Sequence, residues 1–419
     1  MPVELPVSPS EAMPPKPPRA IVWLALFVVC MLISVVGNLL TWPDARPTAS
    51  AWFWVRLLVV PTLAWSLAFG LRLHYFQEET NRLAAEEDTL TEDRATALQF
   101  ASEPLAVVGC TYLCSLGKVN AAATIAQGKT EFGALTPHSG GEAVRHTALT
   151  LSEDANEPGR YRACFMELLD LITEKLTVIP FAAPLTVCLH LPSDTAQPLL
   201  LETWKTCWQE RALRPAAASL LPIGQGLMAL DKWLDIQGGP ALEKFTLFVS
   251  AQLHDTPPRN SAEAAVALLL GWAPLAERRA LKPLAMLHRP VESATESLDE
   301  AISTTLLWGQ TTALQINDLW QAGLEKADKP ALVQSASDLT LGVSKTDKLA
   351  GIHDVDTAIG HPGVAAGWLA VALAIEYAAD SGNPQLTAWR EGSLRFAVVQ
   401  PAVQGGVAQS SDEIMESTA

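Results

Sequence analysis

Two long apolar stretches stand near the N-terminus, and about 340 residues of mixed character follow them. The stretches run from Ala20 to Trp42 and from Ala51 to Leu73. Each is long enough to cross a bilayer as a helix, which takes roughly 20 residues. The link at residues 43–50 holds two prolines and two charged residues. This pattern predicts a two-helix transmembrane hairpin over residues 20–73.

Basic residues flank the hairpin on its outer sides. Lys16 and Arg19 precede the first stretch, Arg72 and His74 close the second, and the link offers Arg46 alone. Since cytoplasmic flanks carry the excess of Lys and Arg, both termini are expected in the cytoplasm of a bacterial inner membrane. Residues 1–19 would then form a disordered cytoplasmic leader.

A charged segment free of Pro and Gly follows, and it predicts a helical connector over residues 74–100. It has two interpretations, a docking surface or a solvated connector, and the mixed-sign charge pattern favours the connector. At the other end, residues 404–419 are small, polar and acidic. We expect them to form a disordered tail.

Between these segments, β-prone apolar runs alternate with helical periodicity, which predicts a layered α/β fold. The expected strands are residues 104–113, 184–192, 245–252, 262–272, 281–290, 330–336 and 394–402. The expected helices are residues 119–128, 160–176, 199–213, 224–236, 293–327 and 364–381. Two similar halves follow, at residues 101–275 and 276–403.

The composition narrows the possible functions. The formal net charge is −16 and no basic run is interleaved with aromatic residues, which argues against a nucleic-acid partner. The six cysteines are scattered and are expected to be buried thiols in a reducing compartment. Cys110 and Cys114 lack further ligands, and so does the pair His254 and Asp255, so no metal is predicted. The loop at residues 137–142 lacks the Lys and Ser/Thr of a phosphate-binding loop, so no cofactor is predicted.

Several short motifs, taken in order, resemble the β-ketoacyl synthase branch of the thiolase-like superfamily. These are PLAVVGCTYLCSLGK at residues 104–118, PLTVCLHLP at 184–192, EKFTLFVSAQLHD at 243–255 and IGHPGVAAGWLA at 359–370. The last is similar to that family's G-H-x-x-G-A-A-G segment, with Val364 in place of an inner glycine. The resemblance implies a thiolase-like five-layer αβαβα fold built from two similar halves. It also implies a homodimer that pairs through first-half sheet edges, for which residues 244–252 are the candidate edge or its neighbour.

The chemistry that the resemblance implies is incomplete in this sequence. The family's nucleophilic cysteine stands at a strand-to-helix elbow, where the helix dipole lowers the thiol pKa. Residues 218–223 at that place read ASLLPI and contain no cysteine. The family's other histidine, after the second-half strand, is also not found in ALVQSASDLT at 331–340. No catalytic residue is therefore predicted. His361 is a vestigial candidate, and a structural role at the start of a helix is favoured for it.

Two hypotheses about function follow. The first is a non-catalytic, membrane-anchored cytoplasmic scaffold with a pseudo-ketosynthase fold that docks a protein partner. Its architecture resembles accessory and adaptor proteins of type VI secretion, including the lipase-adaptor type, so the partner would be an effector or part of the secretion apparatus. The alternative is a membrane-tethered acyltransferase or condensing enzyme acting on acyl thioesters. In that hypothesis His361 is the base and Ser219 or Cys188 the nucleophile, while Cys207 lies too far upstream of the elbow.

Overall fold

A computed structural model describes residues 16–41, 43, 48–136, 142–151, 157–222, 224–293 and 298–402. The first 15 residues of the expected leader and the whole expected tail lie outside these ranges. Internal contacts divide the chain into two compact units, one up to Gln99 and one from Phe100 onward. Each unit is described by itself.

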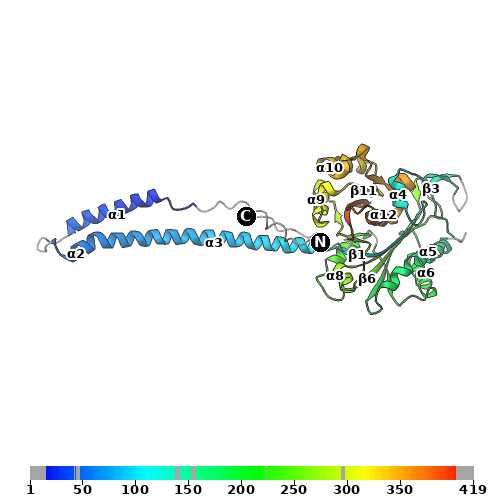
Figure 1. Cartoon of the computed structure of the whole chain (residues 1–419), viewed down its shortest axis with the longest axis horizontal. Helices are drawn as coiled ribbons and strands as arrows, with labels where there is room; N and C mark the ends of the chain where they lie inside the picture. Colours follow the sequence, from blue (N-terminus) through cyan, green and yellow to red (C-terminus); the bar gives the residue numbers. More distant parts are fainter. Residues whose placement is uncertain are drawn as a thin grey trace, which may run out of the picture. The chain divides into compact units, whose positions relative to one another are not determined.

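The first unit contains helices and no strands among its described residues (Figure 1). It contains α1 (Ala20–Thr41), α2 (Ala51–Trp54), the π-helical turn η1 (Val55–Val59) and α3 (Val60–Ser102). Helix α1 packs against the second apolar segment. Ser34 Oγ donates to the Leu57 carbonyl at 3.2 Å, and Trp65 Nε1 donates to the Trp23 carbonyl at 2.9 Å. The two apolar segments therefore form a hairpin held by side-chain to backbone hydrogen bonds.

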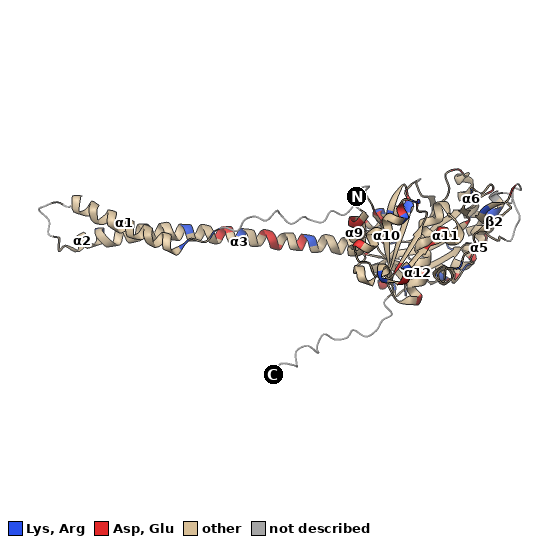
Figure 2. Ribbon diagram, turned by 90° about the horizontal axis from the view of Figure 1, so that it is seen from above, with Lys and Arg blue, Asp and Glu red and all other residues tan. Residues whose placement is uncertain are grey.

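Three helical segments are long and apolar enough to cross a membrane, judged by length and composition within the described residues. Two belong to the hairpin, at Ala20–Thr41 and Ala51–Ser102, and their outer side chains are exposed. The third, Gly363–Ser381, is largely buried inside the second unit and is a core helix. The predicted connector is the polar continuation of α3, where Figure 2 shows acidic and basic residues along the helix.

The second unit begins with a half built on five strands of one large mixed sheet. The strands are β1 (Leu105–Leu113), β4 (Leu185–His190), β5 (Ala217–Leu220), β6 (Phe245–Gln252) and β8 (Ala264–Trp272). The helices are α4 (Ala121–Ala126), α5 (Glu157–Val178), α6 (Gln197–Glu210), α7 (Met228–Leu234) and α8 (Ala273–Arg278). A separate small sheet joins β2 (Gly133–Leu135), β3 (Val144–Thr147) and β7 (Ser261–Ala262).

The second half repeats this plan. Its strands are β9 (Ala285–Leu287), β11 (Asp318–Ala322), β12 (Ile352–Asp354), β13 (Gln385–Glu391) and β14 (Ser393–Pro401), and β10 (Val291–Glu292) pairs with β14. The α-helices are α9 (Leu298–Trp308), α10 (Asp328–Asp338), α11 (Val355–Ile359) and α12 (Ala366–Ser381). Short 3₁₀ turns are η2 (Ala313–Gln315), η3 (Gly342–Lys345), η4 (Asp347–Leu349) and η5 (Gly363–Ala365).

The strand order shows that the halves are equivalent. The large sheet reads β12-β11-β13-β14-β9-β1-β8-β6-β4-β5. If the five main strands of each half are counted in chain order, both halves read third, second, fourth, fifth, first from the outer edge. In each half the fifth strand is antiparallel to both of its neighbouring strands. The second strand is parallel to both of its neighbouring strands. The halves join where β1 pairs with β9.

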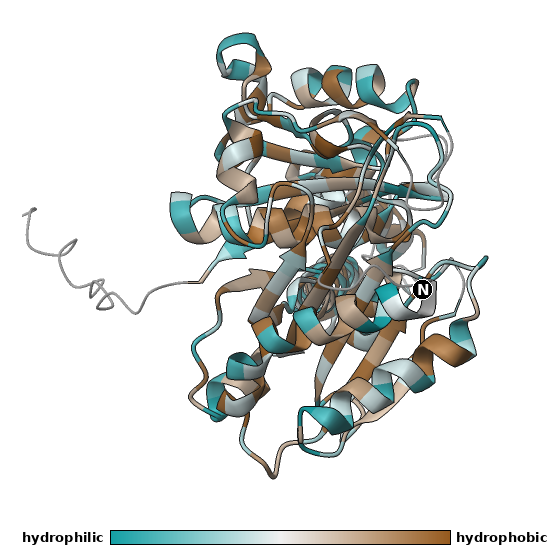
Figure 3. Ribbon diagram, turned by 90° about the vertical axis from the view of Figure 1, so that its right-hand side faces the viewer, coloured by the Kyte–Doolittle hydropathy of each residue, from teal (hydrophilic) through white to brown (hydrophobic). Residues whose placement is uncertain are grey.

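Helices form layers on both sides of these strands (Figures 1 and 3). Helices α5 and α6 cover the outer face of the first half, and their apolar residues form one core with alternate residues of β4, β6 and β8. A second core lies between the halves and contains α12, α7 and α4 together with strand residues of both halves. With α9 and α10 outside the second half, the result is the predicted five-layer thiolase-like arrangement.

Three predicted elements are wrong in detail. The region 293–327 is not one helix, because it contains α9, η2 and strand β11. Residues 330–336 are not a strand but lie within α10, which buries Leu332 and Ala336 at helical spacing. The run 244–252 is β6, which lies between β4 and β8 and is neither the sheet edge nor its neighbour. The outer edge strand of the first half is β5.

Candidate functional site

The connection from β5 to α7 is the strand-to-helix elbow where the resemblance places a nucleophile. It begins at Leu221, whose N–H donates to the Leu189 carbonyl at 2.8 Å. Gly224 and Gly226 then have φ angles of +77° and +43°, a region that favours glycine. Ile223 lies outside the described residues. The described part of the elbow carries no cysteine, serine or histidine.

The start of α12 faces this region from the second half, and His361 stands just before it. Its backbone is fixed, because its N–H donates to the Asn260 carbonyl and its carbonyl accepts from Ala262 N–H at 2.9 and 2.8 Å. Its exposed imidazole accepts at Nδ1 from the Gly363 N–H at 2.9 Å. The neutral ring therefore carries its proton on Nε2. This geometry ties the His361 backbone and ring to the start of the helix.

The elbow is occupied by a carboxylate from the β13–β14 hairpin. Any Cβ on Gly226 would overlap the carboxylate of Glu391. Arg395 Nη1 donates to that carboxylate at 2.7 Å, and Arg395 Nη2 donates to the Gly224 carbonyl at 3.4 Å. Burial raises the pKa of Glu391, while its bonds to Arg395 act in the opposite direction. The ion pair thus links the second-half hairpin to the first-half elbow.

A buried histidine completes this cluster. His190, at the end of β4, accepts at Nδ1 from Trp368 Nε1 at 3.0 Å, and its Nε2 lies 3.5 Å from Glu391 Oε1. Burial lowers the pKa of His190 to about 4, and the nearby charge of Arg395 acts in the same direction. His190 is therefore neutral at pH 7. Its ring positions Trp368 on α12 and Glu391 through its two nitrogens.

A small cavity of about 150 Å³ remains beside the cluster. Its lining comes from the elbow, the start of α12 and the end of β13, namely Leu227, Gly363, Val364, Ala366, Gly367, Trp368, Trp389, Arg390 and Glu391. The volume is below the roughly 300–1,000 Å³ typical of small-molecule sites. Space for a substrate is therefore limited beside the elbow and the start of α12.

The candidate nucleophiles of the catalytic alternative lie toward the outer edge of the first-half sheet, on β4 and β5. Ser219 on β5 and Cys188 on β4 are neighbours, with Oγ and Sγ 3.8 Å apart. The segment after His361 docks on β6, where Val364 N–H donates to Gln252 Oε1 at 3.1 Å. Ser219 is two strands from β6, about 10 Å across the sheet. Within the described residues, neither Ser219 nor Cys188 forms a hydrogen bond with His361, and burial raises the pKa of Cys188.

Cys207 lies even further from the elbow. It is fully buried on α6 within the core that covers the outer face of the first half. Burial raises the pKa of its thiol to about 11, so the thiolate is scarce at neutral pH. The sheet thus separates Cys207 from α12 and His361.

The segment expected to hold the family's second histidine is not the one that follows a strand, because residues 331–340 lie in α10 and the turn after it. The turn that follows strand β11 begins at Gly323, which has φ +68°. A Cβ placed there would lie 3.7 Å from His361 Cε1. The N–H groups of Gly323 and Leu324 donate to the partly buried Asp356 at 2.9 and 3.3 Å. A glycine faces the imidazole at this position, and no histidine stands in this turn.

The remaining candidate metal ligands take part in the hydrogen bonding and packing of the fold. The backbone of His254 is used by a buried ion pair, because its N–H donates to Glu263 and its carbonyl accepts from Arg160, each at 2.9 Å. Cys110 and Cys114 lie in or against the central core. Within the described ranges, no group of three His, Cys, Asp or Glu side chains is arranged to hold a metal ion. The expected loop at 137–142 lies almost entirely outside the described residues.

Sequence reasoning missed His190, Glu391 and Arg395. They come from three strands separated by up to about 200 residues, so no local motif joins them. One signal was present. Glu391 and Arg395 carry opposite charges on either side of the Gly-Ser turn between β13 and β14, and a buried arginine such as Arg395 is rare unless it is paired.

Comparisons with known proteins agree with this architecture. No protein-family model and no curated protein matches the sequence. Among solved structures, the chain is similar to the ketosynthase from module 1 of the bacillaene synthase of Bacillus amyloliquefaciens FZB42, at 15% identity and a TM-score of 0.51, over 73% of this chain and 77% of that one. The module 6 ketosynthase of the Bacillus subtilis 168 bacillaene synthase matches at 13% identity and TM-score 0.52, over 71% and 70% of the two chains.

An oxazolomycin ketosynthase domain from Streptomyces albus JA3453 matches at 12% identity and TM-score 0.52, over 73% of this chain and 76% of that one. Identities this low carry the fold and not the activity. The second unit of this protein therefore has a ketosynthase-like, thiolase-type mixed α/β fold.

Proposed function

We propose that the protein is a non-catalytic, membrane-anchored cytoplasmic scaffold or adaptor with a pseudo-ketosynthase fold that docks a protein partner. The observation that carries this proposal is the occupation of the elbow by Glu391. A carboxylate held by Arg395 against Gly226 fills the space beside the start of α7. A nucleophile and an oxyanion would need that space, and a fixed negative charge there opposes a developing oxyanion.

The anchor is part of the same proposal. The hairpin of α1 and the apolar part of α3 exposes large apolar side chains such as Ile21 and Leu40, which are 83% and 80% exposed. Exposed apolar surface on this scale favours burial in a bilayer. The flanking basic residues favour cytoplasmic termini in a bacterial inner membrane. Retention of the chain in the membrane pellet after carbonate extraction supports the anchor, and release into the supernatant contradicts it.

The absence of catalysis is tested by mass. Full-length protein in detergent is incubated with acyl-CoA and with acyl carrier protein loaded with an acyl chain, and its intact mass is measured. We expect no covalent adduct. An adduct that disappears in Ser219→Ala or Cys188→Ala would establish the membrane-tethered acyltransferase or condensing enzyme in place of the scaffold.

The adaptor role is tested by partner recovery. A partner would be recovered from detergent-solubilised membranes with a tag on the full-length chain, then purified and rebound to it in isolation. The combination of anchor, stalk and degenerate enzyme-like body resembles the lipase-adaptor type of type VI secretion, so an effector or a secretion component is the expected partner. Recovery of lipids and chaperones alone contradicts the proposal.

A further inference from the structure

The outer edge of the first-half sheet is open. Strand β5 (Ala217–Leu220) pairs with β4 on one side and has no strand on the other within the described residues. The Leu221 N–H points toward β4, where it donates to Leu189. Because peptide groups alternate along a strand, those of Ala218 and Leu220 point away from β4. The edge thus presents backbone donors and acceptors to an incoming strand.

The side chains of β5 include none of those that usually prevent strand pairing at an edge. β5 reads Ala-Ala-Ser-Leu, without a charge, a proline or a bulge, and Ala217 and Ser219 are exposed. The opposite edge of the sheet, β12, differs. Its His353 contacts Asp318 at 2.9 Å and its Asp354 contacts Lys329 at 2.6 Å. Natural sheet edges are commonly blocked by charges, and in the large sheet β12 follows this rule while β5 does not.

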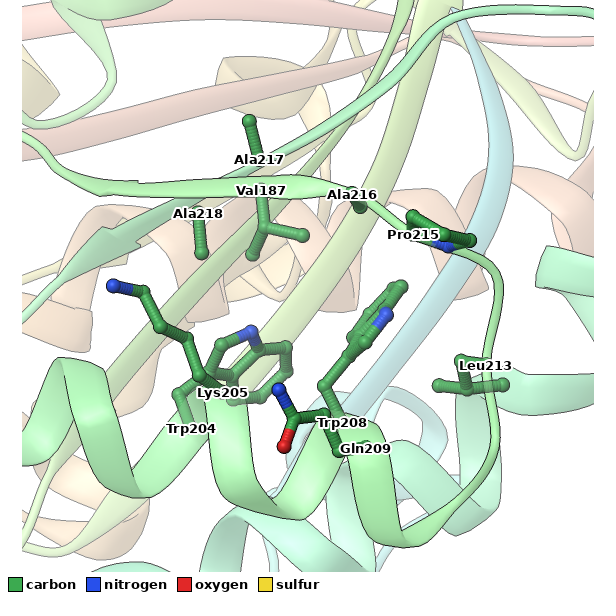
Figure 4. Close-up of a pocket in the computed structure, with 10 residues that line it drawn as sticks. All are labelled: Val187, Trp204, Lys205, Trp208, Gln209, Leu213, Pro215, Ala216, Ala217 and Ala218. Carbon is green, nitrogen blue, oxygen red and sulfur yellow. The ribbon is translucent and has the colours of Figure 1, made fainter.

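A groove of about 500 Å³ lies directly under the open edge, between β5 and α6 (Figure 4). It is lined by Val187, Trp204, Lys205, Trp208, Gln209, Leu213, Pro215, Ala216, Ala217 and Ala218. A strand added to β5 would lie about 4.8 Å further out, and alternate side chains on it would point toward α6. The groove is therefore placed to receive the side chains of an added strand.

The shape and charge of the groove select its occupant. A second copy paired antiparallel through its own β5 would turn Ala216, Ala218 and Leu220 toward this face, and two methyl groups and one leucine fill little of the volume. A larger apolar side chain fits better. The lining contains Lys205 and no carboxylate. The pairing of Lys205 with Glu202 is exposed, and such surface pairs contribute little, so Lys205 can exchange partners.

We propose that the β5 edge and the groove under it dock an extended segment of a partner protein as an added strand. A large apolar side chain of that segment enters the groove, and an acidic side chain two residues away pairs with Lys205. The strand's backbone supplies affinity and the two side chains supply selectivity. This inference rests on the proposed function, because it names the surface through which the adaptor holds its partner.

The first experiment measures hydrogen exchange of the full-length protein alone in detergent. The Ala218 and Leu220 amides are expected to exchange rapidly, while the Leu221 amide is protected by its bond to Leu189. Protection of the Ala218 and Leu220 amides in the protein alone would show that a second copy already covers the edge. That result would overturn the inference in favour of a homodimer.

The second experiment adds a defined probe, an acetylated eight-residue peptide with the repeat Thr-Phe-Thr-Glu. We expect it to bind at sub-millimolar concentration and to slow exchange at residues 218 and 220. A peptide with Lys in place of Glu should bind at least tenfold more weakly, and Lys205→Glu should reverse this preference. Lys232→Glu, an exposed lysine on α7, is the charge-matched control and should leave binding unchanged.

Different results would overturn the docking site and the adaptor function. Ala218→Pro removes the outward N–H and should abolish peptide binding, with near-UV circular dichroism confirming the fold. Binding that survives Ala218→Pro and ignores Lys205→Glu, or no binding at 1 mM peptide, would overturn the inference. If a recovered partner binds Ala218→Pro as well as wild type, the β5 site is wrong while the adaptor function stands. If no partner exists, the adaptor function fails whatever the peptide does.

Discussion

The carboxylate of Glu391 occupies the space into which any side chain on Gly226 would project. These residues belong to different halves of the fold and are separated by 165 positions in the sequence. The pair makes the elbow and the β13–β14 hairpin dependent on each other. Glycine at 226 is required both by this contact and by its positive φ angle.

Replacement of Gly226 by alanine should therefore destabilise the protein strongly. The new methyl group would displace Glu391 and take up a strained backbone, for a combined loss of about 3–4 kcal/mol of unfolding free energy. Gly224→Ala is the matched control, because Gly224 also has positive φ but no atom lies within 4 Å of its Cβ position. It should cost about 1 kcal/mol. Urea denaturation in detergent measures both, and equal losses would contradict the packing argument.

Removal of the carboxylate should also destabilise the protein. Glu391→Ala leaves the Arg395 guanidinium buried beside the Gly224 carbonyl without its main partner. Breaking a buried ion pair costs about 3–5 kcal/mol, and because the Glu391 side chain is 22% exposed we expect about 2–3. The double variant Glu391→Ala, Arg395→Met should recover part of the loss. If the double variant is as unstable as the sum of the singles, the two residues act independently.

The buried His190 predicts a stability change between pH 6.5 and 4. Its pKa is about 4 in the folded protein and near 6.5 when unfolded, so between these values only the unfolded chain binds the proton. Unfolding free energy should therefore fall as pH drops through this window, by about 3 kcal/mol at most. Glu391, whose pKa is raised by burial, acts in the opposite direction as pH rises.

Comparison of wild type with His190→Asn isolates the histidine, because all other groups titrate in both proteins. The difference in urea midpoint between the two should shrink as pH falls from 7 to 4.5. A constant difference across this range would show that His190 has the same pKa in the folded and unfolded states.

The buried pair of Arg160 and Glu263 should contribute more to the free energy of unfolding than a surface pair that involves the same helix. Arg160 contacts Glu263 at 2.6 Å with both side chains less than 5% exposed. Arg160→Met leaves the Glu263 carboxylate buried without a cation and should cost about 3–5 kcal/mol. Arg162→Met removes an exposed partner of Glu210 and should cost less than about 1 kcal/mol. The melting temperatures of the two variants and of the wild type, measured at one pH, test this difference.

Much of the fold was predictable because most strands are apolar runs bounded by turns, as in β1, β4, β6 and β8. The failures have physical reasons. Strand β11 is five residues long, fully buried and preceded by helix-prone sequence, so its pattern does not alternate. Helix α10 has small and β-branched residues that resemble a strand, and only its burial at Leu332, Ser335 and Ala336 shows the helical period.

The candidate site was predictable only in part. His361 and the glycines near it were found because they form one contiguous motif at the start of a helix. The elbow was located by its glycines, but its occupant was not, because Glu391 reaches it through the pairing of β13 with β14 and through the packing of α12. Contacts between the two halves depend on how the whole chain folds, and the spacing of residues within a short motif does not reveal them.

Helix α12 is as apolar as a membrane span, yet it lies in the protein core. It is synthesised late, after every strand of the first half. Under the proposed anchoring, the N-terminal hairpin would hold the nascent chain at the bilayer and bring this segment close to lipid before it folds. Prior folding of the first half would then offer α12 a protein surface, and this order of synthesis would favour its burial in the core over its insertion into the bilayer.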